Sequence, residues 1–136
     1  MNNTRFATAI HIMTISALDP DEWLSSEWIA GSININPVIV RKEIGNLIKA
    51  GLVESRKGKG GGCRISRSSD KISIAEIYSA VKNSEVLGKK NQNPNPKCTV
   101  GKNINENLDS LFTETDHLVT QFLGKKYLSH FIQQFK

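Results

Sequence analysis

Basic side chains with the chemistry to bind a polyanion are concentrated in one stretch of this 136-residue chain. Residues 41–71 contain nine basic and three acidic residues, a net charge of +6, whereas the rest of the chain carries a net charge of −1. Lysine and arginine neutralise phosphates, and an arginine guanidinium also makes bidentate hydrogen bonds to guanine. Such clustering indicates a surface for a polyanion. Charge alone is equally compatible with a solvated basic face that binds nothing.

The elements around this stretch predict how the basic side chains are held. Asn36 followed by Pro37 is a typical helix start, because asparagine caps the first amides and proline suits the first turn. The helix ends at Gly51, and residues 52–55 and 64–66 read as short strands joined by a glycine-rich loop. A helix beside a flexible basic hairpin fits a major groove and its flanking backbone. We therefore predict a winged helix-turn-helix that binds double-stranded DNA.

Other helix signals lie on both sides of this motif. A first helix is predicted at about residues 4–17, and Ser25 or Ser26 caps a second. Ser73 with Glu76 forms a capping-box pattern for a fourth. The third helix, which follows Asn36, should bury an apolar stripe made of Val40, Ile44, Leu47 and Ile48.

A heptad pattern in residues 102–123 predicts a long helix with one apolar seam. The seam consists of Ile104, Leu108, Leu111, Leu118 and Phe122, with Thr115 completing the spacing of four and three. A lone helix with such a face is marginal in water, so it needs a partner. That partner is either a second copy or the remainder of a monomeric core. We favour a homodimer, because DNA readers of this kind often bind two half-sites.

These patterns divide the chain into three predicted parts. Residues 1–84 form the DNA-binding domain, residues 85–101 an irregular loop with two Asn-Pro pairs and Cys98, and residues 102–136 the dimerisation helices. The predicted fold class is mainly α with a small β-hairpin: a winged helix-turn-helix followed by a long C-terminal dimerisation helix.

The sequence offers little for other kinds of chemistry. The three histidines lack metal-ligand spacing, and no arrangement of nucleophiles or carboxylates suggests an enzyme. The glycine-rich loop lacks the Gly-Lys-Ser/Thr ending of a nucleotide-binding loop. Two cysteines do not make a disulfide framework, no apolar run spans a bilayer, and the first residues do not resemble a secretory signal. We predict a cytoplasmic non-enzyme with no metal, no cofactor and no membrane partner.

Several motifs resemble the Rrf family of bacterial winged-helix regulators, which includes the IscR, NsrR and CymR proteins. They occur in the family's order: Arg5-Phe6-Ala7, Asn36-Pro37, Ala50-Gly51-Leu52-Val53, the glycine-rich wing of residues 58–62 and the capped helix start at residues 73–77. The loop at residues 93–98 looks most like the YwnA-type branch. The resemblance covers nearly the whole chain.

The resemblance implies a homodimer that binds a palindromic operator, usually as a repressor. Carried over by position, the base-reading residues are Asn36, Val38, Ile39, Arg41 and Lys42. The wing contacts are Arg56, Lys57 and Lys59, and Arg5 lies near a phosphate. The chemistry agrees, because arginine suits guanine, aliphatic side chains suit thymine methyl groups, and wing lysines add affinity without sequence information.

The chain departs from the cluster-binding members of that family at its cysteines. Those members carry three closely spaced cysteines before the long helix, whereas this loop has only Cys98. An iron–sulfur cluster usually needs four ligands, so none is expected. Lys97 and the following helix start favour the Cys98 thiolate, which makes redox sensing one interpretation and an unreactive loop cysteine the other. Cys63, on the wing, stands where the family commonly has an aromatic residue.

Two further functions fit the same fold. A protein-interaction module would act through a partner enzyme, as some members of this family do. An effector sensor would respond to a small molecule or an oxidant and shift between forms that bind and do not bind DNA. Salt-dependent binding to duplex DNA that weakens in Arg41→Ala or Lys57→Ala would separate the regulator from the interaction module.

Overall fold

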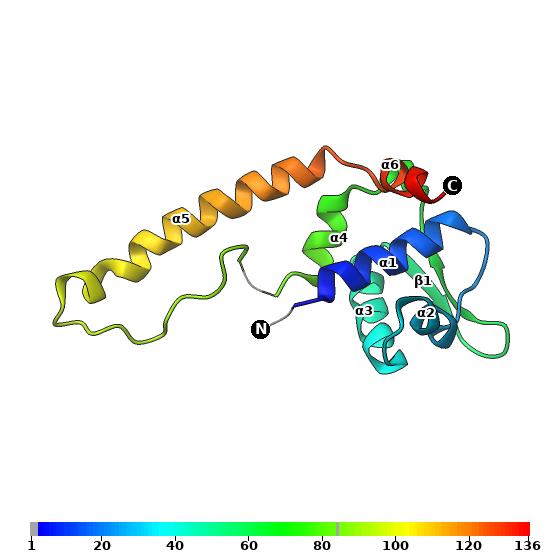
Figure 1. Cartoon of the computed structure of the whole chain (residues 1–136), viewed down its shortest axis with the longest axis horizontal. Coiled ribbons are helices and arrows are strands. Elements are labelled where there is room, and N and C mark those ends of the chain that lie inside the picture. The colour runs from blue at the N-terminus through cyan, green and yellow to red at the C-terminus, as the bar shows by residue number, and fades with distance from the viewer. Residues whose placement is uncertain (1–2, 84) are drawn as a thin grey trace. The chain divides into compact units, whose positions relative to one another are not determined.

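The computed structural model describes residues 3–83 and 85–136, which form six α-helices and a two-stranded antiparallel sheet (Figure 1). In chain order the helices and strands are α1 (Arg5–Leu18), α2 (Ser26–Ile33), α3 (Pro37–Lys49), β1 (Val53–Arg56), β2 (Gly62–Ile65), α4 (Ile74–Val81), α5 (Thr99–Gly124) and α6 (Leu128–Ile132). Short 3-10 turns at Ser69–Lys71 and Gln133–Phe135 follow β2 and α6. The predicted fold class, mainly α with one β-hairpin, is confirmed.

The chain divides into two compact units. The first contains the chain up to Lys82 together with Leu123–Lys136, and the second contains Asn83–Phe122. The predicted domain boundary at residue 84 lies outside the described residues. α5 begins at Thr99, so the long helix starts before the predicted residue 102 and takes up the end of the predicted loop.

Side-chain caps fix the starts of three helices in the first unit. Of the two serines predicted to cap α2, Ser25 does so. Its Oγ accepts a hydrogen bond from the Trp28 amide at 3.1 Å. Asn36 caps α3 in the same way. At α4 the predicted capping box is present, with the Glu76 amide 3.2 Å from Ser73 Oγ and the Ser73 amide 2.9 Å from Glu76 Oε2. Each cap gives a partner to an amide that the first helical turn leaves unpaired.

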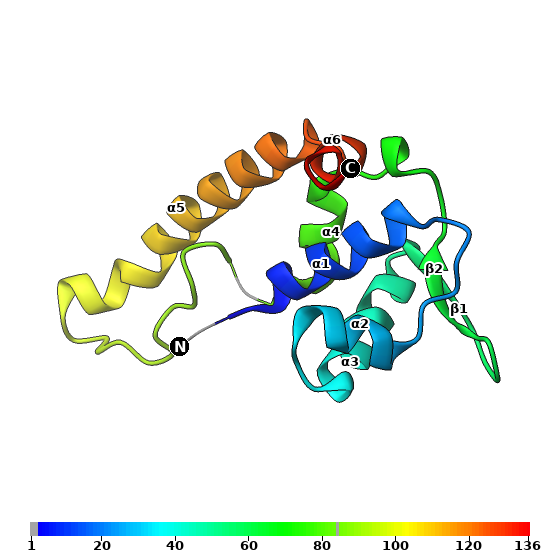
Figure 2. The ribbon, with the colours of Figure 1, turned by 45° about the vertical axis from the view of Figure 1, so that its right-hand side comes forward.

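The apolar faces of these elements form one core in the first unit. Figure 2 shows α1 at the centre of this unit, with α4 and α6 to one side and α2 and α3 to the other. The largest fully buried apolar side chains are Ile12, Met13, Ile29, Val40, Leu47, Leu52, Ile72, Ile77 and Leu128. α3 buries Val40, Ile44 and Leu47, but the prediction that Ile48 joins them is wrong. Ile48 is 39% exposed, because eight helical residues rotate it about 80° away from Val40.

α6 completes this core from a distant part of the sequence. The Leu128 amide donates to the Ile72 carbonyl at 2.9 Å, and the Ile74 amide donates to the Lys126 carbonyl at 2.8 Å. Both Leu128 and Ile132 are buried. The predicted group of dimerisation helices, residues 102–136, therefore includes a helix that lies in the first unit.

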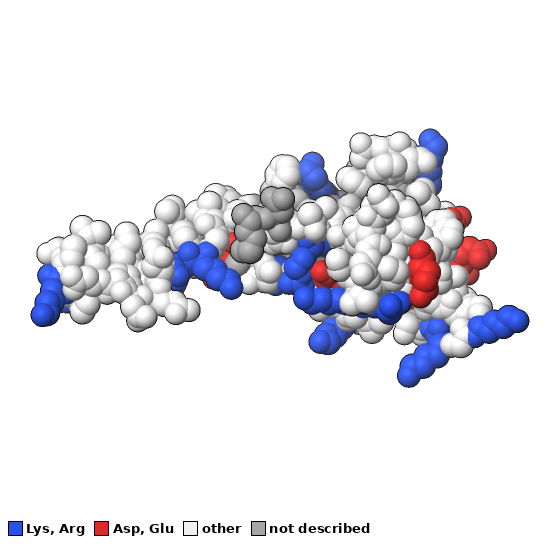
Figure 3. All heavy atoms as spheres, turned by 60° about the horizontal axis from the view of Figure 1, so that its bottom comes forward, with Lys and Arg blue, Asp and Glu red and all other residues white. Residues whose placement is uncertain are grey.

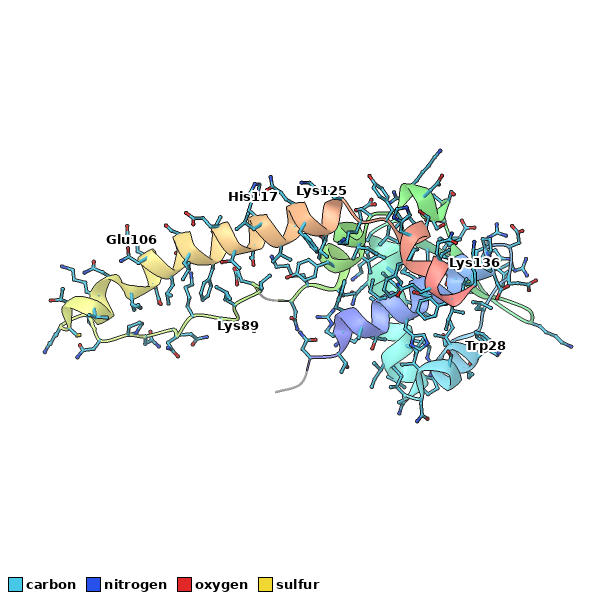
Figure 4. The ribbon with its side chains drawn as sticks, turned by 45° about the horizontal axis from the view of Figure 1, so that its top comes forward. Trp28, Lys89, Glu106, His117, Lys125 and Lys136 are labelled. Carbon is cyan, nitrogen blue, oxygen red and sulfur yellow. The ribbon has the colours of Figure 1, made fainter. Side chains whose placement is uncertain are left out.

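The second unit pairs most of α5 with the irregular segment that precedes it. Three contacts hold the segment along the helix in the opposite chain direction: Val86 amide to Asp116 Oδ1 (2.8 Å), Lys90 with Asp109, and Asn105 Nδ2 to the Asn91 carbonyl (2.9 Å). Figure 4 labels Lys89 on the segment and Glu106 and His117 on the helix. α5 has no buried residue. Within the described part of the chain, no helix is both long and apolar enough to span a bilayer.

Candidate nucleic-acid interface

The outer face of α3 presents four of the predicted base-reading side chains to solvent. Val38 is 62% exposed and Ile39 is 46% exposed. Arg41 and Lys42 are exposed beside them. The buried stripe on the opposite side of the helix turns this face outward. It therefore combines aliphatic side chains with two cations, the mixture that major-groove base edges accommodate.

Asn36, the fifth predicted base-reading residue, is engaged by the helix itself. Its Oδ1 accepts a hydrogen bond from the Val38 amide at 2.8 Å. An asparagine amide also carries two N–H donors. The capping geometry therefore uses the acceptor of Asn36 and leaves its donors at the exposed start of α3.

Arg41 is held on the surface by a carboxylate of α2. Arg41 Nη1 lies 3.2 Å from Glu27 Oε1, and both side chains are largely exposed. An exposed ion pair of this kind contributes roughly 0–1 kcal/mol. The ion pair therefore holds Arg41 only weakly, and another hydrogen-bond acceptor could replace Glu27 at little energetic cost.

Arg5 lies at the first turn of α1 and is paired with a buried carboxylate of α3. Arg5 Nε lies 3.1 Å from Glu43 Oε2, and the Glu43 side chain is only 2% exposed. Asn46 Nδ2 donates to Glu43 Oε1 at 2.9 Å. Three side chains thus join α1 to the inner face of α3, in an arrangement that holds the helix rather than one that frees Arg5 for a phosphate.

The hairpin carries the predicted wing residues. Its register pairs Glu54 with Arg64 and Arg56 with Gly62. Lys57 and Lys59 are exposed at the tip and make no hydrogen bond or ion pair with any described residue. Figure 3 shows lysine and arginine side chains extending outward from this end of the first unit. The wing therefore offers unpaired cations of the kind that bind a phosphate backbone.

Close backbone approaches explain two of the wing glycines. A Cβ at Gly61 would lie 2.1 Å from the Arg56 carbonyl oxygen, and one at Gly62 would lie 2.2 Å from the Leu24 carbonyl oxygen. Gly62 also has a φ of +148°, which side chains rarely allow. The glycines predicted to give flexibility thus also permit a tight hairpin packed against the segment before α2.

The two cysteines have opposite environments. Cys63 in β2 is buried, and desolvation raises the pKa of its thiol to about 11 although the Ser16 hydroxyl acts in the other direction. Cys98 is exposed just before α5, and hydrogen bonds from the amides of Gly101 and Val100 lower the pKa of its thiol. Only Cys98 combines access to solvent with stabilisation of the thiolate.

Three residues around these cations were not found from the sequence. Glu27 and Glu43 pair with arginines that were predicted to contact DNA. Trp23 lies against Arg56 and Arg64 on the hairpin. No local pattern marks Glu27 or Trp23 as a partner, because each contact joins segments that are distant in sequence. The buried side of α3 offered one signal, since Glu43 interrupts an otherwise apolar stripe.

Comparison with known proteins identifies relatives over almost the whole chain. The family model Rrf2, described as an iron-dependent transcriptional regulator, matches residues 2–134. The chain is 42% identical over 128 residues to YwnA of Bacillus subtilis (strain 168), named as a candidate HTH-type transcriptional regulator. That match covers 94% of each protein.

Solved structures share the same architecture. A crystal structure described as a candidate DNA-binding protein is 38% identical, with a TM-score of 0.73 and coverage of 92% of this chain and 96% of that one. CymR (YrzC), the global cysteine regulator of B. subtilis, is 19% identical with a TM-score of 0.70, covering 98% and 97% of the two chains. The second comparison shows the shared fold.

The iron in the family description does not fit the side chains of this chain. The chain has two cysteines. Cys63 is a buried thiol in the first unit, whereas Cys98 lies in the second unit. The described residues contain no group of three histidine, cysteine or acidic side chains arranged to hold a metal ion. Iron–sulfur clusters are held mainly by cysteine thiolates, usually four. We therefore assign no step to iron.

The winged helix, the match along residues 2–134 and the 42% identity to YwnA lead to one conclusion. The chain belongs to the Rrf2 family of transcriptional regulators.

Proposed function

We propose that this protein is a homodimeric, sequence-specific DNA-binding repressor of a palindromic operator. The observation that carries the proposal is the exposed face of α3, with Val38, Ile39, Arg41 and Lys42, on the same compact unit as a wing whose Lys57 and Lys59 are unpaired among the described residues. The proposal also makes it a non-enzyme that works beside the chromosome in the cytoplasm.

The two parts of this surface have separate tasks. Arg41 leaves Glu27 and makes bidentate hydrogen bonds to a guanine, while Val38 and Ile39 contact thymine methyl groups. Lys57 and Lys59 neutralise phosphates, which adds affinity that depends on salt and little on sequence. A role for Arg5 at a phosphate has less support, because its guanidinium is bonded to Glu43.

The homodimer is supported by the exposed part of the heptad seam. Leu111, Leu118 and Phe122 are each more than half exposed on α5. Ile104 and Leu108, nearer the start of the helix, are half-buried within the second unit. A second α5 seated on the exposed part would bury apolar area and set the distance between two reading helices. A monomer by light scattering at micromolar concentration would contradict this part of the proposal.

The deciding experiment is selection of bound fragments from genomic DNA, followed by affinity measurements on the selected operator at several salt concentrations. The wild-type protein should enrich a palindrome, and Arg41→Ala should weaken binding. Lys102→Ala, which removes an exposed lysine from α5, is the matched control and should leave affinity unchanged. Weak binding that Arg41→Ala does not alter would instead favour the protein-interaction module that acts through a partner enzyme.

A response to thiol oxidation has one supporting observation, the exposed Cys98 whose thiol pKa is lowered by the amides at the start of α5. Under this proposal, oxidation of Cys98 changes operator binding. Repeating the selection with and without reductant, for the wild type and for Cys98→Ser, tests it. If oxidant treatment leaves the wild type and Cys98→Ser equally bound to the operator, sensing through Cys98 is wrong.

A further inference from the structure

The segment before α2 forms a third edge beside the hairpin. Leu24 and Cys63 exchange two backbone hydrogen bonds of 2.9 Å, amide to carbonyl in both directions. In this antiparallel bridge the residue before Leu24 lies next to the residue after Cys63. Trp23 is therefore the neighbour of Arg64 on the outer face of the sheet. The absence of a side chain at Gly62 allows this approach.

The indole ring of Trp23 contacts the guanidinium groups of both strands. Arg56 Cζ lies 4.8 Å and Arg64 Cζ 4.3 Å from the ring centroid. Both distances are within the range of a cation–π interaction. The register places the two arginines on the same face of the hairpin, because Arg56 pairs with Gly62, two residues before Arg64.

Each arginine is also tied to the hairpin by a hydrogen bond. Arg56 Nη2 donates to the Gly60 carbonyl at 3.0 Å, which closes the glycine-rich loop. Arg64 Nε donates to Glu54 Oε1 at 2.7 Å across the two strands. The negative charge of Glu54 reduces repulsion between the guanidinium groups. The Trp23 ring thus contacts both Arg56, which closes the loop, and Arg64, which links the two strands.

We infer that Trp23 is a positioning residue for DNA binding, which orders the wing through Arg56 and Arg64 before DNA arrives. The inference rests on the proposed function. A glycine-rich loop has many accessible conformations, and each must be given up when Lys57 and Lys59 settle on phosphates. With Arg56 held between the Trp23 ring and Gly60, part of that ordering is complete in the free protein. An arginine has five N–H donors, so Arg56 can still reach a phosphate.

The test compares three substitutions at one position. Trp23→Ala removes the ring, Trp23→Leu keeps apolar bulk without an aromatic face, and Trp23→Phe keeps an aromatic face. Trp28→Ala is the matched control, since Trp28 is an exposed tryptophan on α2 (Figure 4), and the wing arginines Arg56 and Arg64 stack on Trp23 instead. Thermal unfolding first establishes that every variant is folded.

Wing order is measured without DNA, by the rate of tryptic cleavage after Lys57 and Lys59. Trp23→Ala and Trp23→Leu should be cleaved about tenfold faster than wild type, as expected for losing two exposed cation–π contacts. Trp23→Phe and Trp28→Ala should be cleaved at nearly the wild-type rate. Equal rates for all variants, or equal rates for Trp23→Leu and Trp23→Phe, would overturn the inference.

DNA affinity is measured on the same proteins with the selected operator. Trp23→Ala and Trp23→Leu should bind about tenfold more weakly, because the ordering must then occur on binding, while Trp23→Phe should restore most of the affinity. Faster cleavage with unchanged affinity would show that the wing contacts do not position the DNA-binding groups, and would overturn the inference. If the wild type itself does not bind DNA, the proposed function fails, and the cleavage rates still report separately on the wing.

Discussion

α3 and the hairpin both present cations to solvent, yet different forces hold them. α3 is anchored from behind by a buried apolar stripe and by the Glu43 carboxylate that pairs with Arg5. The hairpin buries Cys63 and Ile65 on its inner face, and its outer face is held by Trp23. Base edges require side chains placed accurately, whereas phosphates tolerate variation. Under the proposed function, α3 would owe its accurate placement to burial, and the wing would be ordered by contacts on its outer face.

The largest effect is expected where the anchor of α3 is broken. Arg5→Ala leaves the buried Glu43 carboxylate without its cation. Loss of one partner of a buried pair costs about 3–5 kcal/mol, and the lower end applies here because the Arg5 side chain is 26% exposed. The free energy of unfolding, measured in urea, should fall by about that amount. A fall of less than about 1 kcal/mol would mean that the pair does not anchor the helix.

A double variant separates the charge from the packing. Arg5→Met with Glu43→Leu removes both charges and keeps apolar bulk, and such replacements are often neutral or stabilising. It should therefore recover most of the stability that Arg5→Ala loses. If the double variant is as unstable as the single one, the shape of these side chains matters more than their charges.

Alanine at two glycines should have opposite effects in the two regions. Gly62→Ala forces a Cβ to 2.2 Å from the Leu24 carbonyl oxygen, so we expect a loss of about 2 kcal/mol in unfolding free energy. Gly45 lies in α3, where a Cβ would meet no atom of another element within 4 Å. Gly45→Ala should stabilise the protein by about 0.5–1 kcal/mol. Equal effects at both positions would remove the contrast between helix and hairpin.

Substitutions of exposed cations should distinguish base reading from phosphate binding. Arg41→Ala should weaken binding to the selected operator by about 1–3 kcal/mol and relax the sequence preference at one base pair. Lys57→Ala should weaken all sequences to a similar extent and reduce the log–log salt slope by about 0.9. Titrations against the operator and a scrambled duplex measure both quantities. A loss of base preference in Lys57→Ala would assign reading to the wing instead.

Alkylation of the two thiols perturbs the structure least. The rate at Cys63 reports on access to the inner face of the hairpin, and the rate at Cys98 is the exposed reference. Cys98 should be alkylated quickly, and its rate should persist below the usual thiol titration range because its pKa is lowered. Cys63 should react only when the hairpin opens, since its thiol is buried and its pKa is about 11. Mass spectrometry after timed alkylation gives both rates. Similar rates at the two cysteines would show that the inner face of the hairpin is open.

The sequence predicted the elements that depend on local chemistry. The Asn36 cap, the Ser73–Glu76 capping box and the glycine after α3 are interactions among neighbouring residues, and each was found. The apolar stripe of α3 was right at Val40 and wrong at Ile48, since the 3.6-residue period rotates the last position outward. Periodicity thus identified the buried face but not its edge.

The partners of the candidate site could not be predicted in the same way. Arg5 and Glu43 are 38 residues apart, and Arg41 and Glu27 are 14 apart. Sequence patterns give no distance between such segments, so arginines that look available can already be paired. Trp23 was missed for the same reason. The roles of the predicted DNA-contacting residues therefore stay predictions until binding is measured.

The contact of α6 with the rest of the first unit has a consequence for how the protein is made. Leu128 and Ile132 fill the core, and Lys126 and Leu128 bond to the chain on either side of Ser73. On the ribosome, the DNA-binding unit cannot close its core until residues 123–132 have been synthesised, after the whole of the preceding second unit. A nascent chain that already carries α3 and the wing would still lack part of the support for α1 and α4. The first unit therefore gains its complete core only after α6 has been synthesised.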